Sequence, residues 1–195
     1  YIGGTQQVDP YLDETTYIIS GTEDPAGLPG NLTRDIANTT HGGNLTVIGT
    51  SDPVVTSGGP FGGSCWEVDG NFGMRIQDAP ANPAGETYTY ELWANFSSFA
   101  TRKVMLRSTL ANNKYFTYEV NTSGYVNFSS REGEIDLTSS SGLSLNTWHH
   151  IALTNDGTNT KIYIDGTRVG QSGWSVGQNY STGGSIDILN TGAHW

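Results

Sequence analysis

The sequence predicts an all-β protein of many short strands joined by turns. Gly (26 residues), Ser, Thr and Asn are abundant in the 195-residue chain, and these residues weaken or compete with helical backbone. Over residues 88–96 the side chains alternate between two faces, and this period of two indicates a strand. Gly-rich and Asn-rich turns separate the short apolar runs, as expected for many strands joined by tight connections.

Each expected strand is a short run between turn residues. In chain order the runs cover 16–20, 44–49, 54–55, two segments within 64–78, 88–96, 103–107, 114–120, 124–128, 134–137, 147–154, 161–165 and 167–170. The two segments within 64–78 flank Asp69-Gly70, a dipeptide favoured in hairpin turns. Residues 1–15 are polar and without period, so we expect an extension or linker there and a single sandwich domain over 16–195.

Composition excludes several classes of partner. The net charge is −10 with only nine Lys and Arg residues, so no basic face is available for nucleic acid or for an anionic membrane surface. No apolar stretch is long enough to insert into a membrane. A single cysteine excludes an intrachain disulfide framework and a thiolate zinc site.

Residues 145–170 hold two adjacent histidines and two aspartates, which raises the possibility of a catalytic or metal site. His149 and His150 are neighbours on an expected strand, so they point to opposite faces and cannot both bind one metal ion. Asp156 and Asp165 each precede a glycine in a hairpin, where aspartate favours the turn. We therefore expect structural roles for these residues.

The same segment resembles the concanavalin A-like lectin/glucanase superfamily in its laminin G-like branch. The pattern is a run "W-H-hydrophobic-A", a turn, and then "hydrophobic-Y-hydrophobic-D-G". The matching residues are Trp148, His150, Ile151, Ala152, Tyr163, Asp165 and Gly166. The segments 61–71 and 88–96 resemble earlier strands of the family, in family order. The resemblance implies an antiparallel β-sandwich of two sheets with jelly-roll, concanavalin A-like topology. The chain departs from the family at SIDILNTGAHW, where the family's usual last strand is expected to be missing, replaced by another segment, or beyond this sequence.

The resemblance also raises glycoside hydrolysis, because glucanases of the superfamily carry "E-x-D-x-E" motifs. The segment EIDL offers Glu134 and Asp136, but the second glutamate of the motif is absent. Retaining hydrolysis needs two carboxyl groups about 5–5.5 Å apart. We therefore expect no enzymatic activity, and a degenerate glycoside hydrolase is the least favoured alternative.

Candidate ligand-binding residues lie near the C-terminus. Trp174, Tyr180 and Trp195 occur among Gly, Ser and Asn residues, a setting that suits an aromatic platform for sugar. Core packing or a contact with a neighbouring chain would explain these aromatics equally well. Calcium is the one cofactor that the resemblance leaves open, and no aspartate lies in a recognised calcium motif, so we assign no metal site.

These observations favour a non-enzymatic structural or adhesion module on a virion surface, such as a capsid decoration, fibre or tail appendage, with host carbohydrate as a candidate ligand. The expected partners are other virion or surface chains in an oligomeric assembly, and cell-surface glycans. The alternative is a secreted, glycosylated eukaryotic lectin or adhesion domain, which seven N-x-S/T sequons favour. Either reading places the protein outside cells or on a virion surface.

Overall fold

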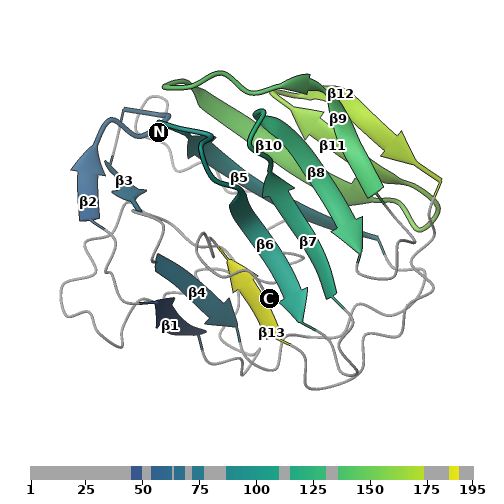
Figure 1. The fold of residues 1–195 in the computed structure, drawn as a ribbon, viewed down its shortest axis with the longest axis horizontal. Coiled ribbons are helices and arrows are strands. Elements are labelled where there is room, and N and C mark those ends of the chain that lie inside the picture. Colours follow the sequence, from purple (N-terminus) through teal and green to yellow (C-terminus); the bar gives the residue numbers. More distant parts are fainter. Residues whose placement is uncertain are drawn as a thin grey trace, which may run out of the picture.

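The computed structural model describes residues 45–49, 54–62, 64–68, 72–76, 87–109, 115–130, 136–173 and 185–188 (Figure 1). Every regular element among these residues is a strand. The strands are β1 Leu45–Gly49, β2 Val54–Ser57, β3 Ser64–Glu67, β4 Phe72–Ile76, β5 Tyr88–Asn95, β6 Lys103–Thr109, β7 Tyr115–Val120, β8 Tyr125–Ser130, β9 Asp136–Gly142, β10 Trp148–Asn155, β11 Thr160–Ile164, β12 Thr167–Ser172 and β13 Ser185–Ile188. The described part of the chain contains no helix with the length and apolar character needed to cross a bilayer.

Two main antiparallel sheets form the sandwich. The larger sheet has the order β1-β4-β13-β6-β7-β8-β9, and the smaller has the order β12-β11-β10-β5. The smaller sheet lies behind β6–β9 in Figure 1. A separate β2-β3 hairpin lies beside them. This arrangement confirms the expected all-β sandwich.

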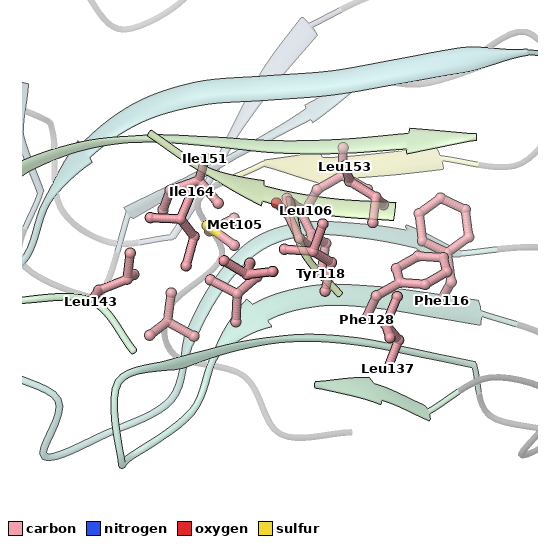
Figure 2. Close-up of a cluster of buried hydrophobic side chains, with 14 residues drawn as sticks. Met105, Leu106, Phe116, Tyr118, Phe128, Leu137, Leu143, Ile151, Leu153 and Ile164 are labelled. Atoms are coloured by element: carbon pink, nitrogen blue, oxygen red, sulfur yellow. The ribbon is translucent and has the colours of Figure 1, made fainter. Parts of the chain in front are cut away.

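The core fills the space between the two main sheets (Figure 2). Ile151 and Leu153 of β10 face Tyr118 and Phe128 of the larger sheet, and all four side chains are buried. Burial of each such side chain stabilises the fold by about 1.5–3 kcal/mol. On β5 the alternation predicted from sequence is present, because Tyr88, Tyr90, Leu92, Ala94 and Phe96 pack against this core. The odd-numbered residues of β5 therefore face away from it.

Strand β13 is a long-range element that the sequence pattern did not reveal. It lies between β4 and β6, and Asp187 stands beside Arg75 on one side and Arg107 on the other. The Asp187 side chain is buried and accepts two hydrogen bonds from Arg75, at 2.7 and 2.9 Å. A segment close to the C-terminus therefore completes the middle of the larger sheet, a role that sequence analysis assigned to no part of the chain.

The prediction that the strands on either side of Asp69-Gly70 pair with each other as a hairpin is wrong. The two strands exist, but β3 pairs with β2, whereas β4 pairs with β1 and β13. Both edges of β4 are thus occupied by partners from distant sequence, and this tertiary pairing outweighs the local turn preference. The expected strand 134–137 overlaps β9, which runs further, to Gly142, and residues 134 and 135 lie outside the described part of the chain. The expected strand 16–20 and the proposed boundary at residue 15 lie outside the described residues.

Candidate carbohydrate-binding surface

The outward face of the smaller sheet carries a cluster of aromatic rings. Trp93 of β5 stands directly opposite His150 of β10 in the antiparallel register, and their ring centroids are 5.2 Å apart. Phe61, from the loop after β2, packs edge-on against Trp93 with centroids 5.1 Å apart and an interplanar angle of 74°. We call these three residues the aromatic platform.

The aromatic platform is open to solvent. Phe61 is 80% exposed and Trp93 is 42% exposed, which is unusual for rings of this size. Two large rings at a steep angle form a corner rather than a flat patch. In such a corner, the apolar C–H face of a sugar ring can stack on one aromatic ring while the edge of the same sugar packs against the other.

The loop that presents Phe61 is held in place by Trp148. The indole N–H of Trp148 donates a 2.8 Å hydrogen bond to the carbonyl oxygen of Gly58. The loop then turns tightly, with the Gly62 N–H donating to Gly59 at 3.0 Å and with positive φ at Gly58 and Gly62. Trp148 therefore anchors a loop that comes from another part of the sequence, 90 residues away.

Polar groups flank the aromatic platform, as specific sugar recognition requires. The Nε2 atom of His150 lies 3.3 Å from Oε2 of Glu91, whose side chain is 60% exposed. Asn95, opposite Trp148 in the register, is also exposed on this face. Carboxylate and amide oxygens accept hydrogen bonds from sugar hydroxyls, and the amide and imidazole N–H groups can donate them.

His149 points the other way from His150, as expected from strand geometry. It is buried, its Nδ1 lies 2.7 Å from Oδ2 of Asp165, and its Nε2 accepts a hydrogen bond from the Ser144 N–H at 3.1 Å. Because Nε2 accepts, the ring is neutral with its proton on Nδ1, which donates to Asp165. This network leaves no imidazole nitrogen of His149 available for a ligand.

Asp165 closes the turn between β11 and β12. It has a φ of 50°, it is followed by Gly166 at 76°, and its Oδ1 accepts a 2.9 Å hydrogen bond from the His150 N–H. Burial raises the pKa of the Asp165 carboxyl, but hydrogen bonds from His149 and His150 outweigh burial and lower the pKa overall. Asp165 thus has the turn role expected from sequence.

The Asp156 side chain likewise stabilises the turn in which it lies. Its Oδ1 accepts from the Thr158 and Asn159 N–H groups, and its Oδ2 pairs with Lys161. The hydrogen bond from Lys161, followed by those from the turn N–H groups, lowers the pKa of this carboxyl. Among the described residues, no group of three or more His, Cys, Asp or Glu side chains is placed to hold a metal ion.

The other sequence-based candidates are not brought to the aromatic platform. Trp174, Tyr180 and Trp195 lie outside the described residues, as does Glu134. Asp136 is exposed on β9, an edge strand of the larger sheet, opposite Ser129. Of the motif residues, His150 is part of the platform, Trp148 anchors the Phe61 loop and Ile151 lies in the core. Ala152 and Tyr163 are opposite each other on β10 and β11.

Sequence reasoning missed Phe61 and Trp93 as ligand candidates. The alternation of β5 already placed Trp93 on the face shared with Thr89, Glu91 and Asn95, and a tryptophan among polar residues on an outward face was a usable signal. Phe61 gave no such signal, because only the folded loop brings it to Trp93.

Comparisons with known proteins show which fold this is. A family model described as the concanavalin A-like lectin/glucanases superfamily matches residues 69–193. Domain 4 of AbnA, a GH43 extracellular arabinanase from Geobacillus stearothermophilus solved in complex with arabinotriose, has a TM-score of 0.59 at 15% identity, covering 77% of this chain and 75% of that one. No curated protein sequence matches this chain.

Toxin binding domains are also similar in fold. The binding domain of botulinum neurotoxin serotype D/C has a TM-score of 0.53 at 16% identity, covering 78% of this chain and 41% of that one. A botulinum neurotoxin type C structure, described with cell entry dependent on two ganglioside molecules, has a TM-score of 0.52 at 14% identity, covering 76% and 39%. This chain thus spans about two fifths of those chains, and the likeness establishes a lectin-like β-sandwich fold.

Proposed function

Because the chain belongs to the concanavalin A-like lectin/glucanase superfamily, we propose that it is a binding module without catalytic activity that takes carbohydrate on the aromatic platform. The observation that carries this proposal is the pair of exposed rings, Phe61 and Trp93, set at 74° beside Glu91 and His150. The arabinotriose complex of the arabinanase domain and the ganglioside dependence of the neurotoxin support a carbohydrate ligand for this fold.

The absence of a catalytic role is supported by the chemistry on the platform. Glu91 is paired with an imidazole rather than with a second carboxyl group at the spacing that retaining hydrolysis needs. Asp136 of the EIDL segment faces outward from the larger sheet, on the opposite side of the sandwich from Glu91. The two acids are therefore too far apart to act on one glycosidic bond.

We place this module on a virion surface, as part of a capsid decoration, fibre or tail appendage that binds host glycans within an oligomeric assembly. The acidic charge of −10 and the Gly, Ser, Thr and Asn richness support an exposed, soluble particle surface. The seven sequons support the second candidate, a secreted eukaryotic adhesion domain. Intact-mass measurement on native material separates the two, because glycan mass on several asparagines is expected only for the second.

The experiment that tests sugar binding is a glycan-array screen of the purified domain, run once with calcium and once with chelator. Binding to a defined sugar class is the supporting result, and the comparison of the two conditions shows whether calcium takes part. Trp93→Ala and Phe61→Ala should each lower the affinity about tenfold or more, since each removes a stacking surface. Clean absence of binding by the folded protein would overturn the proposal.

Tyr125→Ala is the matched control. Tyr125 is also an exposed aromatic, at 37%, but it projects from β8 on the outer face of the larger sheet. Its removal should leave the affinity unchanged. Equal losses in Tyr125→Ala and Trp93→Ala would place the sugar elsewhere and contradict the assignment of the platform.

A further inference from the structure

Two carboxylates contact His150, one at its ring and one at its backbone. Glu91 contacts the imidazole at 3.3 Å, and Asp165 accepts the backbone N–H of the same residue at 2.9 Å. The Glu91 and Asp165 side chains are 60% and 50% exposed, so both face solvent. Solvent-exposed aspartate and glutamate side chains carry a negative charge at neutral pH.

The described Lys and Arg residues of the same sheet lie on strands other than β5, which carries Glu91. Arg168 is on β12, three strands from β5, which corresponds to about 14 Å at the usual strand spacing. Lys161 is two strands from β5, opposite Thr154 rather than His150, and it pairs with Asp156. Among the described residues, the ionic partner of Glu91 is His150, so the negative charge nearest to Trp93 is that of the Glu91 carboxylate.

We propose that this platform selects neutral glycans and rejects acidic ones, and that Glu91 is the residue that determines this specificity. The inference rests on the proposed function, because it assigns a ligand class to the same site. A hydroxyl group of a neutral sugar stacked on Trp93 can donate a charge-assisted hydrogen bond to Glu91. A sialic acid, uronic acid or sulfated sugar in the same position brings a like charge close to Glu91, which is unfavourable.

The experiment compares matched glycan pairs, each a neutral oligosaccharide and its sialylated or sulfated counterpart. These probes are printed on one array and then titrated in solution. Wild-type protein should bind the neutral member of each pair more tightly. Raising the salt concentration should narrow the gap, because screening weakens interactions between exposed charges.

Glu91→Gln and Asp136→Asn form a matched pair of variants. Each removes one negative charge, but Asp136 lies on the opposite face of the sandwich. Glu91→Gln should raise affinity for the acidic member by about two- to fivefold, the range expected for one exposed charge interaction. Asp136→Asn should leave both affinities unchanged.

The outcomes separate the two proposals. Equal or tighter binding of acidic glycans by wild type, or equal effects of Glu91→Gln and Asp136→Asn, would overturn the specificity and leave the sugar-binding function intact. Failure of the folded protein to bind either member of any pair would overturn both. Tighter binding of neutral glycans, with a gap that Glu91→Gln narrows and Asp136→Asn does not, is the supporting result.

Discussion

His149 and Asp165 are joined by a 2.7 Å hydrogen bond that fastens the start of β10 to the turn after β11. The same carboxylate also holds the backbone of His150, whose ring is part of the aromatic platform. A network that joins the buried His149 to the half-exposed Asp165 thus fixes the position of a residue on the outward side of the sheet. The "W-H" and "D-G" parts of the motif are linked physically as well as by sequence spacing.

The first prediction concerns this link. Asparagine offers one oxygen in place of two, so Asp165→Asn leaves either His149 or the His150 N–H without its acceptor. We expect it to lower the free energy of unfolding by about 1–2 kcal/mol at pH 7, the usual range for a charge-assisted hydrogen bond. Urea denaturation measures this loss, and Asp136→Asn, an exposed carboxylate on β9, is the control.

The pH dependence of this loss has a definite sign. The pKa of Asp165 is lowered in the folded protein, so its stabilising effect is present above the unfolded value of 3.8 and is lost as the pH falls through the folded value. The difference between wild type and Asp165→Asn should therefore be constant near neutrality and shrink below about pH 4. A difference that grows on acidification would contradict the assigned hydrogen bonds.

The second prediction concerns the anchor of the Phe61 loop. Trp148→Phe keeps an aromatic ring but removes the N–H that Gly58 accepts. Global stability should fall by about 1 kcal/mol or less, because the lost hydrogen bond is exposed to water. Sugar affinity should fall several-fold, since Phe61 is no longer held against Trp93. Titration of the variant beside wild type measures the affinity, and amide exchange at residues 58–62 reports on the loop. Unchanged amide exchange at residues 58–62 would show that the hydrogen bond from Trp148 does not hold this loop in place.

How much of this fold the sequence alone predicts depends on how far apart in the sequence the contacting residues are. The alternation of β5 and the pairing of β10 with β11 follow from local period and turn chemistry, and both were predictable. The insertion of β13 between β4 and β6 was not, because it depends on Asp187 meeting Arg75, 112 residues away. The candidate site shows the same difference between local and long-range contacts. Trp93 could be placed on an outward face from its strand, whereas Phe61 reaches it only through a loop positioned by Trp148.

The third prediction compares two glycines with similar backbone conformations. Gly124 has a φ of 81° and Gly166 a φ of 76°, so alanine is strained at both positions by about 1 kcal/mol. A Cβ at Gly124 would also lie 2.8 Å from Cε2 of Phe99, which packs against the core, whereas a Cβ at Gly166 meets nothing within 4 Å. Gly124→Ala should therefore be about 1–3 kcal/mol less stable than Gly166→Ala. Thermal and urea unfolding of the two variants give this difference directly, and equal stabilities would exclude the crowding at Phe99.

The fourth prediction is a stabilising change in the core. The Tyr118 hydroxyl is buried, and among the described residues it has no hydrogen-bond partner. Removing an unpaired buried hydroxyl relieves its desolvation cost, so Tyr118→Phe should raise the free energy of unfolding by about 1 kcal/mol. Leu153→Ala is a useful contrast, because it empties space in the same core and should cost about 2–5 kcal/mol.

Alkaline pH provides an independent check on Tyr118. Burial raises the pKa of its phenol above the unfolded value of 10.0, so the folded protein keeps a proton that the unfolded chain releases. Stability from this group is present below about pH 10 and is lost as the pH rises further, because deprotonation then favours the unfolded chain. Tyr118→Phe lacks this group, so its advantage over wild type should widen between pH 9 and about pH 11. Urea midpoints of both proteins across that range measure the effect. An advantage that stays constant would mean that the hydroxyl reaches water or a partner in solution.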